Sequence, residues 1–506
     1  MRQYGALNLG AALFSILLSC WAAAKTTVIN PDAICYLYAA SAMEHGLSFA
    51  SHLCSQAKWP FYSILIFGLT QLTHLSYTTA AYILDGFFSL ISVMTFIAII
   101  NLFTQKTRIL MLAAIVILLA HEFNNLRVEI IRDHGYWAFY LLSLFFILQS
   151  VKKIFQQNNH SFYYAILWSV SLAIATLFRI EGLIFLLFLP FAAFLFVQQA
   201  FGARIKMFFQ LNILTLLGGS ALLVWTIMYP QQQYGRLLEV EFQLTQGLNL
   251  FTQTFQQTMH ALATHVLSVY SARDAVWILM GMLAFWYILN IISNVSLIYA
   301  ALIIYAWCKK VTGFNRETRV IVWAYIFINV LITAVFLVDN LFLAKRYLIA
   351  LSLVLMLWVP FALDDLIMQW RTRKWPVLVA AIFILIYGLG GIFDFGHSKK
   401  YIRDGGDWLA LHAAPNAKIY SNNYQLLYYS KHFGEDIFSL GKKFQNLNVI
   451  ANNKWRKYDY VALNISQKEL TQKPSILQEI KIVPTVVFQN DRGDQVLIYE
   501  IREEKR

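Results

Sequence analysis

Charged residues are scarce in this sequence. Asp, Glu, Lys and Arg make up only 13% of its 506 residues, whereas a soluble chain carries about 25%. Hydrophobic residues account for 59% and aromatic residues for 16%, and the mean hydropathy is +0.56. Because so few charges cannot cover a water-soluble fold of this size, a soluble protein is excluded. The composition predicts an integral membrane protein.

Several motifs that carry chemistry are also missing. There is no Gly-rich phosphate loop, internal repeat or low-complexity tract, so nucleotide-binding and ATPase functions lose support. The four cysteines match no metal-ligand spacing. Two of them, Cys35 and Cys54, fall in one loop, where a disulfide and two separate thiols are both open. The net charge of +13 lies in short clusters between apolar runs, which indicates membrane topology and not a nucleic-acid partner.

Eleven apolar runs approach the 20 or so residues that a helix needs to cross a bilayer. The first resembles a signal peptide, but a polytopic chain needs an anchor, so we interpret it as a retained span. The run 276–307 is long, and we predict that it is one tilted or protruding helix. The runs lie near 5–24, 77–101, 108–122, 134–151, 162–178, 182–200, 207–228, 276–307, 319–338, 347–363 and 376–394.

The positive-inside rule decides the placement of a twelfth, shorter run at 60–75. If this run does not cross, the basic clusters between the spans all fall on one side, which must then be the cytoplasm. If it crosses, all of them except Arg2 turn outward. We therefore predict an interfacial helix on the outer face. A second surface helix is predicted within the outer loop 229–275, where Phe251, Phe255, Met259, Leu262 and Val266 recur at helical spacing.

The composition changes after about residue 396. Strand-like stretches and helical stretches alternate there, and the last two strands are joined by the turn 490–493. We predict a transmembrane domain over 1–395 and a periplasmic α/β domain over 396–506 that serves packing or acceptor docking. The fold class is mainly α, a polytopic membrane helix bundle of about eleven spans with a small C-terminal extracytoplasmic α/β domain. The strands are expected at 418–420, 458–465, 483–489 and 495–501, and the helices at 404–412 and 424–432.

On this topology, charged residues gather in the outer loops, where they are costly unless paired or functional. Asp32 follows Pro31 just after the first span, and Arg132-Asp133 opens the fourth. The other segments of this kind are Lys58-Trp59-Pro60-Phe61-Tyr62, the turn Arg179-Ile180-Glu181-Gly182, and Arg346-Tyr347 before a late span.

In their order and sidedness these segments resemble the GT-C glycosyltransferases. The resemblance is to the branch of glycosyltransferase family 39 that includes protein O-mannosyltransferases and lipid A aminoarabinose transferases. Lys58 to Tyr62 is similar to the family's Lys-Pro-Pro-Leu-type segment, with Trp59 in place of a Pro, and Arg179 to Gly182 is similar to its Arg-Pro-Glu-Gly-type turn. Asp85 departs from the family, in which many members carry an Arg nearby. The resemblance implies transfer of a sugar, with inversion, from a polyprenyl-phosphate carrier in a cavity at the outer membrane face.

That chemistry needs both carboxylates and cations. An acceptor hydroxyl is a poor nucleophile at neutral pH, so a carboxylate must take its proton as the new bond forms, and Asp32 is the predicted base. Asp133 is the second predicted catalytic carboxylate, which holds the acceptor or sugar or positions a cation, and Glu122 and Glu129 compete for this role. The leaving lipid phosphate gains negative charge, which fixed cations stabilise. The predicted phosphate and sugar-binding residues are Lys58, Arg132, Arg179, Glu181 and Arg346.

Each of these residues also has a structural interpretation. Asp32 suits a helix cap, Arg179 and Glu181 suit an ion pair at a tight turn, and Lys58 suits a lysine that reaches toward the headgroups. No metal site is predicted, although a divalent cation stays open as a cofactor. The outward histidines match no ligand spacing; they are His45, His52, His121 and His134.

The predicted protein is a bacterial inner-membrane glycosyltransferase with a cytoplasmic N-terminus. Its acceptor is a glycan, lipid or protein hydroxyl. One alternative is a flippase or exporter of lipid-linked sugars, which needs charges along a path through both leaflets and no soluble tail. Another is an O-antigen-type polymerase or ligase that uses a diphosphate carrier, with paired arginines in one very large outer loop; the loop 229–275 has only Arg236 and Arg273.

Overall fold

The protein is represented by a computed structural model that describes residues 2–47, 50, 53–156, 160–228, 252–369, 374–393, 395–432, 454–472 and 483–501. His52, Arg236 and Phe251 therefore lie outside the described residues, as does most of the predicted loop 229–275. The part of that loop at 252–265 is helical, where a surface helix was predicted.

The chain folds into two compact units. The bundle unit comprises Met1–Cys20, Asp85–Arg127 and Arg132–Phe393. The tail unit comprises Trp21–Leu84, Val128–Ile131 and Asp394–Arg506. The C-terminal tail thus shares a compact unit with the predicted first outer loop.

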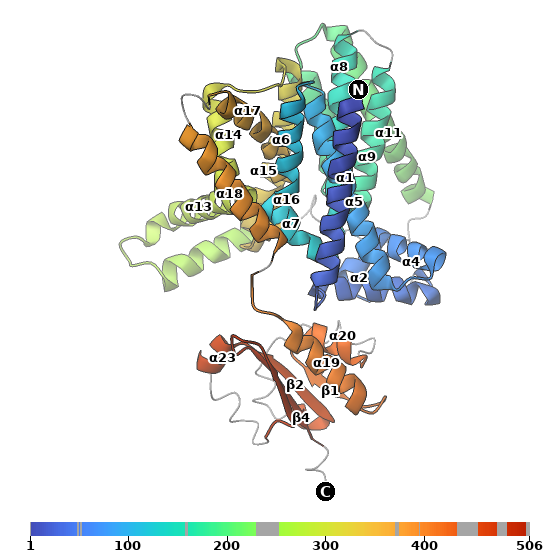
Figure 1. The fold of residues 1–506 in the computed structure, drawn as a ribbon, viewed down its shortest axis with the longest axis vertical. Coiled ribbons are helices and arrows are strands. Elements are labelled where there is room, and N and C mark those ends of the chain that lie inside the picture. The colour runs from blue at the N-terminus through green and yellow to red at the C-terminus, as the bar shows by residue number, and fades with distance from the viewer. Residues whose placement is uncertain are drawn as a thin grey trace. The chain divides into compact units, whose positions relative to one another are not determined.

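The bundle unit is built from long apolar helices, among which α8, α9 and α11 run side by side (Figure 1). Two helices at its start continue into the tail unit, α1 (Arg2–Lys25) and α5 (Tyr77–Asn101). The others are α6 (Thr107–Leu118), α7 (His121–Asn125), α8 (Asp133–Phe155), α9 (Ser161–Phe178), α10 (Gly182–Phe196), α11 (Phe201–Met228), α13 (Ala275–Val295), α14 (Leu297–Lys309), α15 (Arg316–Asn340), α16 (Lys345–Leu355), α17 (Val359–Met368) and α18 (Lys374–Ile392), with short 3-10 turns at Leu126–Val128, Ala272–Asp274 and Met356–Trp358.

Within the described residues, eight helices are long and apolar enough to cross a membrane. The count rises to nine if α6 and His121–Val128, which are bent by 48° at a short break, form one span. The polytopic helical fold is therefore confirmed. The predicted crossings at 182–200 and 207–228 fall on α10, which has only 15 residues, and on the 28-residue α11, and they stay predictions.

The prediction of one helix over 276–307 is wrong. The chain breaks at Ser296, whose φ of +82° is incompatible with a helix, and α13 runs across the direction of α14 (Figure 1). The Ser296 hydroxyl accepts a hydrogen bond from the Tyr299 amide and so caps α14. Asn294 donates to the Lys345 carbonyl at 2.7 Å and accepts from Ser352 at 2.6 Å. Polar side chains that bond away from the helix thus end α13.

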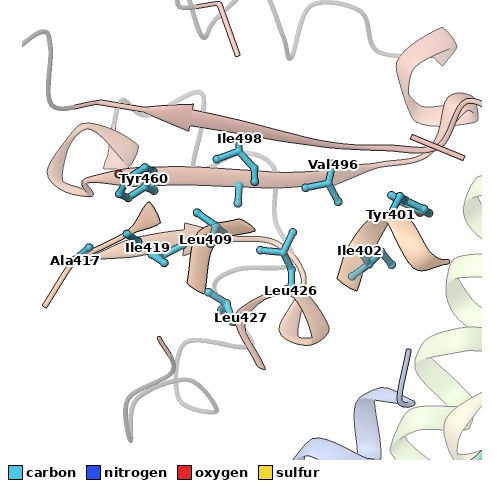
Figure 2. Packing of buried hydrophobic residues seen from close by; sticks show 12 residues of the cluster. Tyr401, Ile402, Leu409, Ala417, Ile419, Leu426, Leu427, Tyr460, Val496 and Ile498 are labelled. Carbon is cyan, nitrogen blue, oxygen red and sulfur yellow. The ribbon is translucent and has the colours of Figure 1, made fainter. Parts of the chain in front are cut away.

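The tail unit contains the predicted α/β fold. Its sheet has the order β1-β2-β4-β3, formed by β1 (Ile419–Ser421), β2 (Tyr460–Ile465), β3 (Val486–Gln489) and β4 (Gln495–Glu500). β1 and β2 are parallel, and the other pairs are antiparallel. The helices α19 (Lys400–His412) and α20 (Tyr424–Ser430) contribute Leu409 and Leu426 to the core that covers the sheet (Figure 2). Each predicted strand and helix of the tail is found.

Two helices of the tail unit come from the N-terminal part of the chain. The helix α2 (Pro31–Ala42) carries Asp32, and α4 (Phe61–Thr73) occupies the run predicted to lie on the membrane surface. With 13 residues, α4 is shorter than the roughly 20 residues of a crossing helix. Two 3-10 turns, Met43–His45 and Ser55–Lys58, lie between these helices. A surface position for α4 agrees with its length.

Candidate functional site

The two ends of the bundle unit carry different charges. The helix α8 has 23 residues, with Asp133 in its first turn and Lys152 and Lys153 in its last. A helix of this length spans about 35 Å, compared with about 30 Å for the bilayer core. The acidic start and the basic end of α8 are therefore separated by about one membrane thickness.

Other basic clusters lie at the Lys152 end. Lys152 donates to the Leu102 carbonyl at 3.1 Å. The ring of Phe103 contacts that of Phe314, with 4.6 Å between centroids, so the 105–108 cluster and the 309–319 loop lie together. The predicted cytoplasmic charges of these loops thus share one end of the bundle unit.

At the opposite end, Arg179 joins two carboxylates. Its Nη1 pairs with Asp133 and its Nη2 with Glu181. Asp133 is buried, and the Arg179 side chain is 10% exposed. Burial acts to raise the pKa of the Glu181 carboxyl, but the neighbouring Arg179 guanidinium outweighs it and the pKa is lowered.

The turn after α9 brings these groups together. Arg179 follows the last residue of α9, and Glu181 is the residue before α10. A Cβ at position 182 would lie 2.6 Å from Thr176 Oγ1 and 2.9 Å from Thr176 N, so only glycine fits there. The spacing Arg-x-Glu-Gly therefore has a steric basis in this fold.

Two further arginines and two tyrosines surround the ion pairs. The Arg179 guanidinium lies over the Tyr347 ring at 4.5 Å and over Tyr136 at 5.8 Å, and Arg346 lies over Tyr347 at 5.3 Å. Arg132 and Arg346 are close enough to Asp133 to stabilise its charge. Three guanidinium groups against two carboxylates leave a formal charge of 3 − 2 = +1.

A pocket opens against this cluster. It is partly open to solvent. Its polar wall includes Arg179, Glu181, Arg346 and Asn329, and its apolar wall includes Phe336. A pocket with net positive charge and aromatic walls can bind an anion that carries an apolar chain.

The competing acidic residues have other partners or belong to the other unit. Glu122 is 2% exposed and accepts from Lys345 at 2.9 Å and from Asn125 at 3.2 Å. Glu129 belongs to the tail unit. Among the three acidic candidates, Asp133 is seen to pair with Arg179 of the pocket.

Asp32 and Lys58 lie in the tail unit. Asp32 is in the first turn of α2, whose N-cap position is taken by Asn30, so Asp32 is not the cap. Gln56 donates through Nε2 to Asp32 Oδ1 at 3.1 Å, and the Ser55 hydroxyl donates to Gln56 Oε1 at 2.9 Å. Gln56 and Lys58 share the 3-10 turn Ser55–Lys58. Sequence reasoning missed Gln56, because no local pattern marks a contact across 24 residues.

A disulfide ties this turn to α2. Cys35 and Cys54 are bonded, with their Cα atoms 6.1 Å apart. Cys35 lies one helical turn after Asp32, and Cys54 immediately precedes the 3-10 turn that holds Gln56. The two alternatives for these cysteines are thereby resolved in favour of the bond.

Two of the four outward histidines contact backbone carbonyls of the protein. His121 Nδ1 lies 2.8 Å from the Tyr387 carbonyl, and His134 Nε2 lies 3.2 Å from that of Leu126. In the described part of the chain, no three His, Cys, Asp or Glu residues gather as a metal site would require.

Solved structures with the same fold include those of two proteins, AglB and ArnT. Oligosaccharyltransferase AglB from Archaeoglobus fulgidus, in complex with an inhibitory peptide and a dolichol-phosphate, aligns at a TM-score of 0.55 and 10% identity over 97% of this chain and 74% of its own. Its complex with Zn and sulfate gives 0.53 and 10% over 97% and 72%. ArnT from Cupriavidus metallidurans bound to undecaprenyl phosphate gives 0.51 and 12% over 98% and 97%.

No family model and no curated protein matches the chain. The structural matches show that the chain shares the fold of these structures of AglB and ArnT. Likeness at 10–12% identity establishes the fold, and the activity is argued from the site below.

Proposed function

We propose that this chain is a membrane glycosyltransferase that moves a sugar from a polyprenyl-phosphate carrier to an acceptor hydroxyl. The observation that carries the proposal is the pocket lined by Arg179, Arg346 and Tyr347, next to a cluster in which three arginines accompany two carboxylates. Two proteins with this fold were solved with lipid phosphates, AglB with dolichol-phosphate and ArnT with undecaprenyl phosphate. The net positive charge suits the phosphate, and the aromatic wall suits the first units of the lipid.

The three arginines have different proposed roles. Both Nη groups of Arg179 already pair with carboxylates, so we assign Arg179, Asp133 and Glu181 to shaping the pocket. We assign the phosphate itself to Arg346 and Arg132. Arg132 Nη1 is buried and has no hydrogen-bond partner among the described residues, so it retains a donor for an anion.

The proposed reaction is a displacement with inversion. The acceptor oxygen attacks the anomeric carbon while Asp32 takes the hydroxyl proton, and the bond from that carbon to the phosphate oxygen breaks. The electron pair leaves with the phosphate, whose growing negative charge the arginines of the pocket stabilise. The Gln56 amide holds one oxygen of Asp32 through a hydrogen bond of 3.1 Å.

We place the site on the outer face of a bacterial inner membrane. The basic loops at the far end of α8 indicate the cytoplasmic side, and the arginine pocket lies at the opposite end. A disulfide beside Asp32 fits an oxidising compartment such as the periplasm.

The exporter alternative has less support. It needs charged groups along a path through both leaflets, whereas beside the pocket the bundle continues as a buried network without charge. There Asn329 donates to Tyr140, and Tyr325 bonds with Ser143 at 2.9 Å and accepts from Trp168 at 3.1 Å.

The test is transfer in proteoliposomes with a set of polyprenyl-phosphate sugars. We expect the wild type to transfer, and Asp32→Asn to lose at least about 100-fold in kcat because its base is gone. Asp491→Asn, which removes an exposed carboxylate from the turn between β3 and β4, is the matched control and should retain full activity. Full activity of Asp32→Asn would remove the base, and no turnover with any monophosphate donor would refute the class.

A further inference from the structure

The C-terminal α/β domain, which is the part of the tail unit after residue 395, is hydrogen-bonded to the segment that leads into α2. Ile29 lies between the end of α1 and Pro31, and both of its backbone polar groups bond to side chains of α20. Gln425 Nε2 donates to the Ile29 carbonyl at 2.7 Å, and the Ile29 amide donates to the Tyr429 hydroxyl at 3.0 Å. These partners are about 400 residues away in the chain.

The two side chains act from a fixed platform. Gln425 and Tyr429 are four residues apart, so they lie on one face of α20. Leu426 and Leu427 of the same helix are buried in the core of the domain (Figure 2). Val28 packs against that core. α20 also packs closely on α19, where a Cβ at Gly406 would come within 2.9 Å of the Leu426 carbonyl. The domain core therefore fixes the two side chains that hydrogen-bond to the Ile29 backbone.

The next residue is fixed as well. Asn30 donates through Nδ2 to the Ile130 carbonyl at 3.2 Å and accepts from the Ile130 amide at 2.9 Å. Pro31 then has a restricted φ, and it places Asp32 in the first turn of α2. Distant partners thus hold the backbone of Ile29 and the side chain of Asn30, and the ring of Pro31 restricts its own φ.

We propose that the C-terminal domain is a positioning element for the base, and that Gln425 and Tyr429 are positioning residues. They act through Ile29, Asn30 and Pro31 on the carboxylate of Asp32. This inference rests on the proposed function, because it takes Asp32 as the base. A general base works only within hydrogen-bond reach of its proton, and a misplacement of 1 Å can reduce a rate by about 100-fold.

The test compares three single variants of α20. Tyr429→Phe removes the hydroxyl that accepts from Ile29, and Gln425→Glu removes the amide that donates to it. Tyr428→Phe removes a hydroxyl from the neighbouring residue and is the control. For the first two we expect kcat to fall about tenfold with the donor KM unchanged within twofold. Tyr428→Phe should match the wild type.

A second measurement does not depend on activity. Hydrogen exchange should become faster in the amides of residues 29–34 in Tyr429→Phe and Gln425→Glu, and stay unchanged in the strands of the tail and in the bundle. Faster exchange with full kcat would overturn the positioning role while the proposed function stands. A fall of kcat together with the unfolding temperature in all three variants would also overturn it, because the effect would then be general destabilisation.

The two proposals fail in different ways. If the wild type transfers no sugar from any polyprenyl-phosphate donor, the proposed function is refuted and the catalytic role of Gln425 and Tyr429 falls with it. If the wild type transfers and the two variants transfer equally well, only the positioning role is refuted.

Discussion

The replacement Arg179→Met tests the centre of the arginine pocket. Arg179 is 10% exposed and is the direct partner of Asp133, which is 4% exposed, and of Glu181. Removing the cation leaves the buried Asp133 carboxylate and the partly exposed Glu181 carboxylate without it, and breaking a buried pair in this way destabilises a protein by about 3–5 kcal/mol. The formal charge of the cluster also falls from +1 to 2 − 2 = 0, so phosphate binding should weaken.

The second variant separates pairing from packing. In Arg179→Met with Asp133→Asn, both members of the pair are neutral, so less charge is left buried than in Arg179→Met alone. We expect the two replacements to couple by about 2 kcal/mol. The control Arg403→Met breaks a pair at 3.6 Å with Asp407, in which both side chains are about half exposed, and should change stability by less than about 1 kcal/mol.

The assay is unfolding of the purified protein in mixed detergent micelles, followed by circular dichroism. Additive free energies for the two replacements would refute the pairing of Arg179 with Asp133. A cost for Arg179→Met no larger than that of Arg403→Met would refute the burial argument.

Three further outcomes are expected. Cys54→Ser removes the bond to Cys35, which is 19 positions away, and should lower the free energy of unfolding by about 3 kcal/mol in chemical denaturation. If the wild type were equally stable with and without reductant, this prediction would be contradicted. Gln56→Leu removes the amide that donates to Asp32 and should lower kcat about tenfold with the donor KM unchanged, and an unchanged kcat would show that this hydrogen bond does not position Asp32. The pKa of Glu181 is lowered in the folded state, so its pair with Arg179 stabilises the protein fully above the ordinary carboxyl pKa. This stabilisation is lost as the pH falls through the folded pKa. Glu181→Gln should remove this acid sensitivity in unfolding experiments.

Local patterns were enough to predict the tail. Short apolar, strand-like stretches marked β2 and β4, and Gly493, at a φ of +91°, ends the turn that joins β3 to β4. The apolar runs marked the bundle helices for the same reason, because length and hydropathy are properties of one segment. The prediction at 276–307 was wrong because the average hydropathy of the run is high in spite of the polar residues Asn294 and Ser296. Asn294 lies at the end of α13, and Ser296 caps α14.

The candidate site was predictable only in part. Arg179, Glu181 and Gly182 form a short motif, and the structure adds the steric reason for its glycine. The contacts of Gln56 with Asp32 and of Gln425 with Ile29 join residues 24 and 396 positions apart, and no periodicity in a single sequence signals them. A pairing of distant segments becomes visible only when the chain is folded.

The hydrogen bonds between α20 and Ile29 can form only late in the synthesis of the protein. At about 5–20 residues per second, a ribosome needs roughly 20–80 s to progress from Ile29 to Tyr429. Throughout that interval the segment before Asp32 exists without its two α20 partners, while the intervening helices are being inserted. Nascent chains arrested before α20 should therefore show an unanchored segment at residues 28–30, and the anchored form should arise only once the C-terminal domain has been translated and folded.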